Sequence, residues 1–176
     1  MKNVCIIFLL SIIISLTAFG FTQSSKETAQ SAETSKYLRM HIRADSNASD
    51  AQAVKYTVRD RVVEYLTPLV AEYETKTQAT TGIQAHLQEI AGVATTVLRE
   101  KGFAYGASAS LETETFPTRV YGEYTLPAGE YTALILRLGK GEGDNWWCVV
   151  YPPLCFAATC ENVVYKSKIL EIIDRF

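Results

Sequence analysis

The chain has 176 residues, of which 48% are hydrophobic and 20% are charged, so it carries enough apolar material to bury the core of a single domain. Its formal net charge is -2, and no run of basic residues occurs along the sequence. The electrostatic footprint of a nucleic-acid-binding protein is therefore missing, and nucleic acid is not an expected partner.

The N-terminus has the pattern of an export signal. Lys2 precedes an almost unbroken apolar stretch from Val4 to Phe21. Its length lies between the core of a signal peptide, about 7–15 residues, and a transmembrane helix of about 20 residues. Small residues at Ala18 and Gly20 suit cleavage after Gly20. Residues 1–21 are therefore predicted to be either a signal peptide or a membrane anchor, and the only part of the chain in contact with a membrane.

A polar spacer follows at residues 22–36, with the sequence TQSSKETAQSAETSK. It contains no large apolar residue, so it cannot bury enough surface to offset the entropy of ordering. We expect a flexible tether in front of a folded domain that spans residues 37–176.

The first half of that domain reads as a strand followed by helices. Residues 37–44 alternate between apolar and polar side chains, which predicts a half-buried strand with Arg39, His41 and Arg43 on its polar face. Ser49 and Gln52 have the spacing of a capping box that opens a helix, and Pro68 should kink or end that helix. A second helix is predicted over residues 81–101, with Gly102 as its stop.

The second half reads mainly as strands, at residues 103–111, 119–124, 131–138 and 146–151. The glycine-rich segment 139–145 joins the last two and suits an antiparallel hairpin. An amphipathic helix closes the chain. This order predicts an α+β fold with a single domain, a largely antiparallel sheet, and helices packed on one face.

The chain contains two histidines, His41 and His86, and both are predicted to lie on the surface. Neither has a cysteine or histidine at the spacing of metal ligands, so no metal or other cofactor is expected. Asp45 and Ser46 lie near His41 in the sequence, but turn and cap chemistry accounts for both without a catalytic triad. No catalytic residue is assigned from the sequence.

Two further patterns are candidates for functional sites. The Gly139–Gly143 segment resembles a phosphate-binding loop, but it joins two strands and has no helix N-terminus behind it. A plain turn or a hairpin tip that meets a partner are the remaining interpretations. An exported hydrolase would use paired carboxylates, and a cell-wall-binding module would use exposed tyrosines. The candidates for these roles are Glu112, Glu114, Glu123 and Glu130, and Tyr121, Tyr124 and Tyr131.

Three of the four cysteines lie near the C-terminus, and Cys5 lies in the apolar leader. An exported protein meets an oxidising or thiol-exchanging environment. The chain reversal at Pro152 and Pro153 suggests a disulfide between Cys148 and Cys155, which would leave Cys160 unpaired. Buried free thiols are the alternative, because a cysteine in a strand is also ordinary core material.

Three segments together resemble the stage II sporulation protein R family of endospore-forming Firmicutes. They are LRMHIRADSNASDAQAVKYTVRD (residues 38–60), LPAGEYTAL (residues 126–134) and GEGDNWWCVVYPPLCF (residues 141–156). The similarity covers nearly the whole domain, and the NWWC and PPLCF motifs are specific. An export segment followed by a polar spacer is also typical of that family.

The resemblance implies a messenger that is not an enzyme. Family members are made in the forespore and exported into the space between the two membranes of the sporangium, as secreted or membrane-tethered proteins. There they trigger a membrane-embedded aspartic-type protease of the mother cell, which cuts the pro-segment from the mother-cell sigma factor precursor. An exported hydrolase or a cell-wall-binding module remains the alternative.

A partner-binding face needs rigid aromatic or apolar anchors, and these are densest around the NWW and YPPL segments. Alternation along the strand places Trp146 and Trp147 on opposite faces, so at most one of them should be a core residue. A purely structural role for both, and a second contact surface at the turn of residues 45–52, are the alternatives. The predicted partner-binding residues are Asn145, Trp146, Trp147, Tyr151, Pro152 and Leu154.

Overall fold

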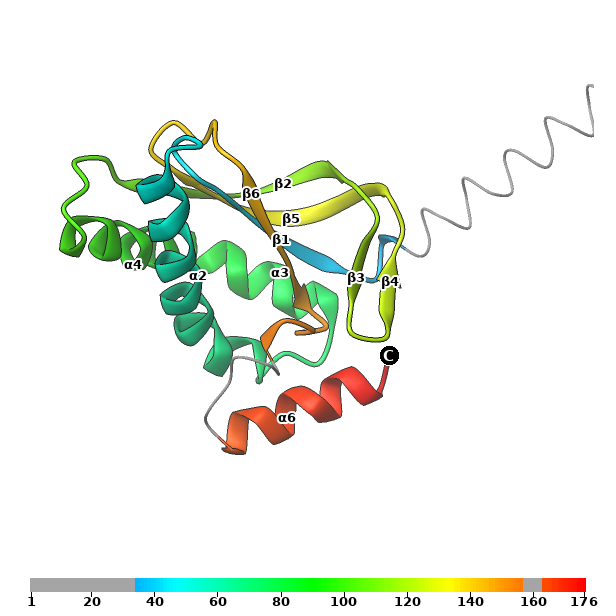
Figure 1. The fold of residues 1–176 in the computed structure, drawn as a ribbon. Coiled ribbons are helices and arrows are strands. Elements are labelled where there is room, and N and C mark those ends of the chain that lie inside the picture. The colour runs from blue at the N-terminus through cyan, green and yellow to red at the C-terminus, as the bar shows by residue number, and fades with distance from the viewer. Residues whose placement is uncertain (1–33, 157–162) are drawn as a thin grey trace, which may run out of the picture.

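The computed structural model describes residues 34–156 and 163–176 (Figure 1). The predicted leader at residues 1–21, spacer residues 22–33, Cys5 and Cys160 lie outside the described residues.

A four-stranded mixed sheet forms the centre of the domain, with the strand order β2-β5-β1-β6. Two of its three strand pairs, β2 with β5 and β1 with β6, are antiparallel, and β1 runs parallel to β5. The strands are β1 (Leu38–Arg43), β2 (Ala107–Phe116), β5 (Gly129–Leu138) and β6 (Asn145–Tyr151).

The hairpin predicted between the last two strands is wrong. β5 and β6 are not neighbours, because β1 lies between them and pairs with both. The glycine-rich connection therefore passes over the end of β1. A loop of this length can also join strands two positions apart, and the pairing of β1 on both sides distinguishes the two arrangements.

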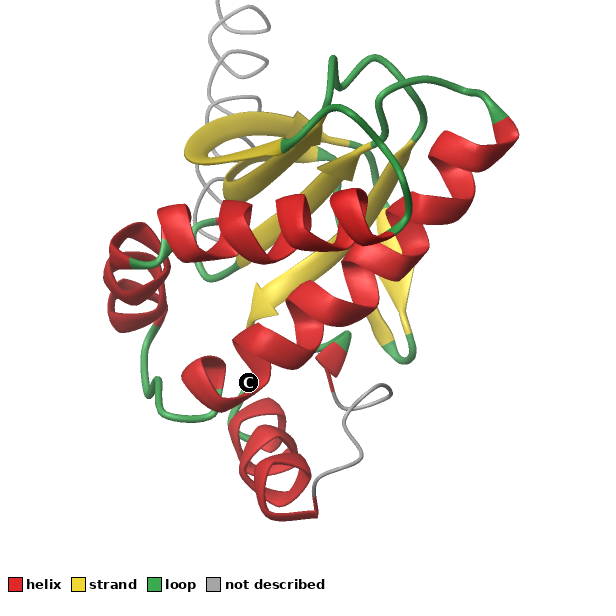
Figure 2. Ribbon diagram, turned by 90° about the vertical axis from the view of Figure 1, so that its left-hand side faces the viewer, coloured by secondary structure: helices red, strands yellow, loops and turns green. Residues whose placement is uncertain are grey.

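Helices cover one face of the sheet, as the views from two sides show (Figures 1 and 2). Their apolar residues meet Met40 and Ile42 of β1, Leu134 and Leu136 of β5, and Cys148 of β6 in the main hydrophobic core. The α+β fold with helices on one face of a largely antiparallel sheet is confirmed. The helices are α2 (Ser49–Val70), α3 (Lys76–Ala85), α4 (Leu87–Glu100) and α6 (Val163–Asp174). Among the described residues, no helix has both the length and the apolar character to cross a bilayer.

The helix ends differ from the predictions in two places. The predicted capping box is absent, because the N-cap of α2 is Ala48. The side-chain amide of Gln52 donates instead to the Ser46 carbonyl oxygen and to Asn47 Oδ1. The helix predicted over residues 81–101 is two helices that are separated at His86, whose backbone leaves helical geometry. Gly102 adopts a φ of +83° after α4, which suits its predicted role as a helix stop.

The other face of the sheet carries a second, smaller apolar cluster, which includes Tyr37, Phe116, Tyr131 and Val149. The hairpin of β3 (Arg119–Tyr121) and β4 (Tyr124–Leu126) packs on this cluster through Leu126 and Tyr121. Because both faces are covered, β1 is buried on both sides, and the prediction of a half-buried strand is wrong.

Candidate partner-binding site

The two adjacent tryptophans lie on opposite faces of β6, and both are half-buried. Trp146 packs against the main core, with the Arg59 guanidinium 5.5 Å from its ring centre. Trp147 packs against the second cluster, where its ring stacks on His41 at 4.1 Å between centroids and the Arg119 guanidinium lies 5.5 Å away. Neither tryptophan is a fully buried core residue, so each presents part of its ring to solvent.

The structure divides the other predicted contact residues. Asn145 is exposed, and Leu154 is half-buried. Tyr151 and Pro152 are buried, and the Tyr151 hydroxyl donates to the Glu74 carbonyl oxygen at 2.6 Å. Burial also raises the pKa of Tyr151. In the described chain, the predicted patch is therefore accessible mainly at its first three residues, Asn145 to Trp147.

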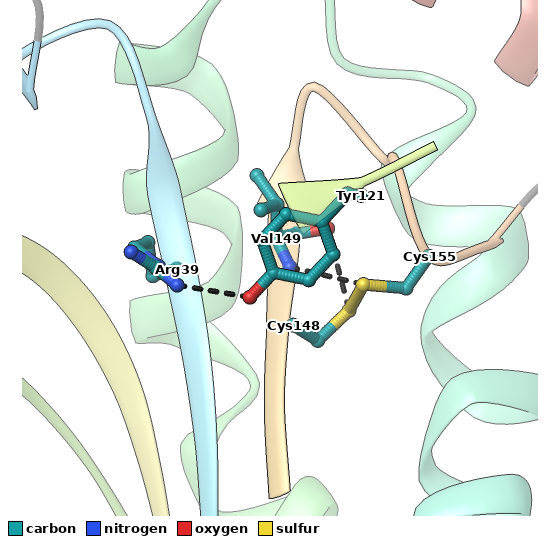
Figure 3. Close-up of a disulfide and its surroundings, with 5 residues drawn as sticks. All are labelled: Arg39, Tyr121, Cys148, Val149 and Cys155. Carbon is teal, nitrogen blue, oxygen red and sulfur yellow. Dashed lines mark hydrogen bonds between the residues drawn. A yellow bond between two sulfur atoms is a disulfide. The ribbon is translucent and has the colours of Figure 1, made fainter. Parts of the chain in front are cut away.

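A disulfide joins Cys148 in β6 to Cys155 in the turn that follows, the pairing that the sequence suggested (Figure 3). Their Cα atoms are 5.9 Å apart, within the usual range for a disulfide. The Val149 amide donates to Cys155 Sγ at 3.2 Å, which holds the turn against the outer side of the strand. The disulfide thus fixes the chain immediately after the two half-buried tryptophans.

The turn at residues 45–52 and the loop at residues 139–145 interlock at the end of β1. The Lys140 amide donates to Asp45 Oδ1 at 2.9 Å, and the Asp144 amide donates to Asn47 Oδ1 at 2.6 Å. A Cβ atom at Gly143 would lie 2.2 Å from the Ser46 carbonyl oxygen, so only glycine allows this approach. The polar residues of the turn hold the loop that leads into Asn145.

Lys55 of α2 closes the same junction from beneath. Its side chain is almost completely buried, and Nζ donates to Gln52 Oε1 at 2.6 Å and to the Asp144 carbonyl oxygen at 2.9 Å. Burial lowers the pKa of Lys55, although the Asp144 carboxylate acts in the opposite direction. A buried lysine needs such partners, so the start of β6 is fixed to both the turn and α2.

Arg39 lies fully buried on the other face of the sheet. Its guanidinium is 4.2 Å from the centre of the Phe116 ring and 4.8 Å from that of Tyr131, and Nη2 donates to the Tyr121 hydroxyl at 2.9 Å. The alternation along β1 predicts that Arg39 lies on a polar, solvent-facing side of the strand, and this prediction is wrong. The aromatic residues Phe116, Tyr121 and Tyr131 in the later strands were the available signal that something covers it.

His41 is also buried, so its predicted surface position is wrong. Its Nδ1 lies 2.8 Å from Glu114 Oε2, and the other oxygen of that carboxylate pairs with Arg43. Burial lowers the pKa of His41 to about 4, and the positive charges of Arg43, Arg137 and Arg39 act in the same direction. His41 is therefore neutral at physiological pH, and its ring stacks against that of Trp147.

Acidification is expected to destabilise the domain through His41. The pKa of His41 is below its ordinary value of 6.5, so its contribution is complete above pH 6.5 and is lost as the pH falls towards 4. We expect the free energy of unfolding to drop by about 2–3 kcal/mol over this range from His41 alone. Urea unfolding of the wild type and of His41→Gln at several pH values checks this. The variant should show the shallower dependence on pH, and equal slopes would contradict the assignment.

Two of the four glutamates considered for a hydrolase, Glu112 and Glu114, form ion pairs with arginines. Glu112 accepts from Arg137 Nη2 at 2.9 Å, and hydrogen bonds from Arg137 and Ser110 lower its pKa to about 2. Glu114 is occupied by His41 and Arg43. A general acid would need a raised pKa, whereas the pKa of Glu112 is lowered. Within residues 34–156 and 163–176, no group of three or more histidines, cysteines and carboxylates could hold a metal ion.

Comparison with known proteins identifies the family of this chain. A family model described as Stage II sporulation protein R matches residues 34–161, which include the interlocked turn and loop, both tryptophans and the disulfide. The chain belongs to the stage II sporulation protein R family. The Stage II sporulation protein R of Bacillus subtilis (strain 168) is 34% identical over 173 residues, which cover 95% of this chain and 76% of that protein. No solved structure matches the chain.

Membership of the stage II sporulation protein R family confirms the resemblance drawn from three sequence segments. Two of those segments, residues 38–60 and 141–156, are brought together by the pairing of β1 with β6 and by the contacts between turn and loop. The family motifs therefore form one continuous structural unit, with Asn145 to Trp147 at its surface.

Proposed function

We propose that this protein is the exported signal of stage II sporulation that tells the mother cell to activate its own sigma factor. It is made in the forespore, exported through residues 1–21, and acts in the space between the two membranes. Its partner is a membrane-embedded aspartic-type protease, which then removes the pro-segment of the sigma factor precursor. Membership of the stage II sporulation protein R family is the observation that carries this proposal.

The geometry supports a binding role over an enzymatic one. The buried ionisable groups His41 and Lys55 contact neighbouring strands and loops. Glu112 and Glu114 form ion pairs with Arg137 and Arg43. Surface aromatic groups next to arginines, by contrast, are the residue types that carry most binding energy in protein interfaces. The protein therefore acts as a ligand of the protease and needs no chemistry of its own.

Reconstitution tests this function directly. The full chain, the protease and the sigma factor precursor are expressed together in a bacterium that lacks all three, and precursor cleavage is followed by immunoblot. Cleavage should require this chain and its export segment, and Glu112→Gln, Glu123→Gln and Glu130→Gln should retain it. Absence of cleavage with an exported, folded chain would contradict the proposal, and loss of cleavage in one folded glutamine variant would favour the hydrolase.

A further inference from the structure

The two edges of the sheet are protected very differently. β2 forms one edge and carries Glu112 and Glu114, and charged side chains on edge strands discourage pairing with another chain. β6 forms the other edge and begins with Asn145, Trp146 and Trp147, which carry no charge and no proline. The start of β6 lacks the features by which proteins usually block strand addition.

The backbone groups on the outer side of β6 can be identified. The Val149 amide points away from β1, because it donates to Cys155 Sγ. Along an antiparallel strand, the backbone N–H and C=O groups of successive residues point alternately towards and away from the neighbouring strand. The groups of Trp147 and Asn145 therefore also point outward. The Cys148 and Trp146 groups face β1, where these residues lie opposite Met40 and Ile42.

Only the second half of this edge is covered. The turn after β6 is closed by hydrogen bonds from the Leu154 amide to the Pro152 carbonyl and from the Phe156 amide to the Pro153 carbonyl, and the disulfide ties it to the strand. Along the described chain, the outward backbone groups of Asn145 and Trp147 have no hydrogen-bond partner. The open edge is therefore the segment Asn145–Trp147.

Side chains on both faces flank this open edge. On the helix face, Arg59 lies between the rings of Trp146 and Tyr56, 5.5 Å and 5.1 Å from their centres, and Tyr56 is 45% exposed. On the opposite face, exposed Arg119 lies over Trp147. Arg59 is paired with Asp60, whereas Arg119 has no carboxylate partner among residues 34–156 and 163–176. The unpaired positive charge favours an acidic side chain opposite Arg119.

We propose that Asn145–Trp147 receives an extended segment of the partner as an additional strand of the sheet, with an acidic side chain directed at Arg119. Main-chain hydrogen bonds to an exposed edge supply affinity in this mode of recognition, and flanking side chains supply specificity. The inference rests on the proposed function, which makes the partner the membrane-embedded protease. It adds the binding mode and a specificity residue, Arg119.

Substitutions can separate the contribution of the backbone hydrogen bonds to binding from that of the side chains. Asn145→Pro removes an outward N–H at the first residue of the strand, where proline breaks no ladder hydrogen bond. Asn145→Val removes the same side chain and keeps the N–H, so it is the matched reference. Arg119→Glu reverses the charge at the exposed arginine. Lys101→Glu makes the same charge change at the exposed end of α4, away from the sheet edge, as a control.

Each full-length variant is tested for precursor cleavage in the reconstituted system and for binding to the purified protease in detergent micelles. Thermal unfolding verifies that each variant is folded. We expect Asn145→Pro to bind and activate at least tenfold less than Asn145→Val, and Arg119→Glu to lose at least tenfold relative to Lys101→Glu. Amide exchange at Asn145 and Trp147 should slow when the protease is added.

The outcomes distinguish this inference from the function on which it rests. If the wild type activates nothing, the proposed function fails. If the wild type activates and folded Asn145→Pro matches Asn145→Val, or folded Arg119→Glu matches Lys101→Glu, the edge is not the docking site. Sedimentation that shows a dimer abolished by Asn145→Pro, with activation intact, would assign the edge to a second copy of the chain and overturn the inference.

Discussion

Replacing Phe116 with alanine is expected to lower the free energy of unfolding by about 3–5 kcal/mol, the usual cost of deleting a buried phenylalanine ring. Phe116 is fully buried in the second cluster. Its ring lies 4.8 Å from that of Trp147 and 5.7 Å from that of Tyr131, with the Arg39 guanidinium 4.2 Å from its centre. The substitution leaves a cavity beside the buried guanidinium of Arg39, which is surrounded by aromatic rings in place of water.

Urea denaturation of the full chain measures this effect. Val120→Ala is the control, because Val120 lies nearby on the β3–β4 hairpin but is 66% exposed, and its loss should cost less than about 0.5 kcal/mol. A cost below about 1 kcal/mol for Phe116→Ala would mean that the second cluster is not a tightly packed core. Loss of the cluster should also uncover Trp147, which shifts its fluorescence to longer wavelength.

Removal of the disulfide is expected to lower the free energy of unfolding by about 2–3 kcal/mol. The link closes a short loop with a sequence separation of 7 residues, for which the chain-entropy estimate is about 2.5 kcal/mol. Cys148 is also fully buried in the main core, so alanine in its place adds a small packing loss.

Unfolding of the oxidised wild type is compared with that of Cys148→Ala/Cys155→Ala and of the wild type in reductant. Both should be less stable than the oxidised protein by similar amounts. Cys160→Ser leaves this pair intact and serves as the control for general thiol effects. Equal stability of the oxidised and reduced wild type would contradict a structural disulfide, and a large loss in Cys160→Ser would point to a different pairing.

Local sequence patterns predicted the elements better than their arrangement. The helical spacing of apolar residues in α2 and the alternation in β6 each depend on a single segment, and the structure has both elements. The insertion of β1 between β5 and β6 depends on contacts about a hundred residues apart, such as Ile42 opposite Trp146. No local pattern encodes such a pairing, so the hairpin prediction failed.

In the candidate site, too, the features that depend on a local pattern were predicted and those that depend on distant contacts were not. The opposite faces of Trp146 and Trp147 follow from the two-residue period of a strand, and the structure agrees. The burial of Tyr151, Pro152 and His41 does not follow, because it depends on which other segments cover each face. Arg39 illustrates the difficulty most clearly, since an arginine on an alternating strand is normally solvent-exposed, and here three aromatic rings replace the solvent.

We propose that this protein activates its partner by binding and not by catalysis. The most direct test is a titration of the purified full chain against a fixed amount of the protease in membrane vesicles. The two are incubated together until activation is complete, the precursor is then added, and the initial rate of its cleavage measures the amount of active protease. A ligand predicts active protease that rises with the amount of chain bound, saturates at a fixed ratio, and declines when the chain is removed. Complete and lasting activation by trace amounts of the chain would contradict this claim, because it would show that one molecule of the chain converts many molecules of the protease.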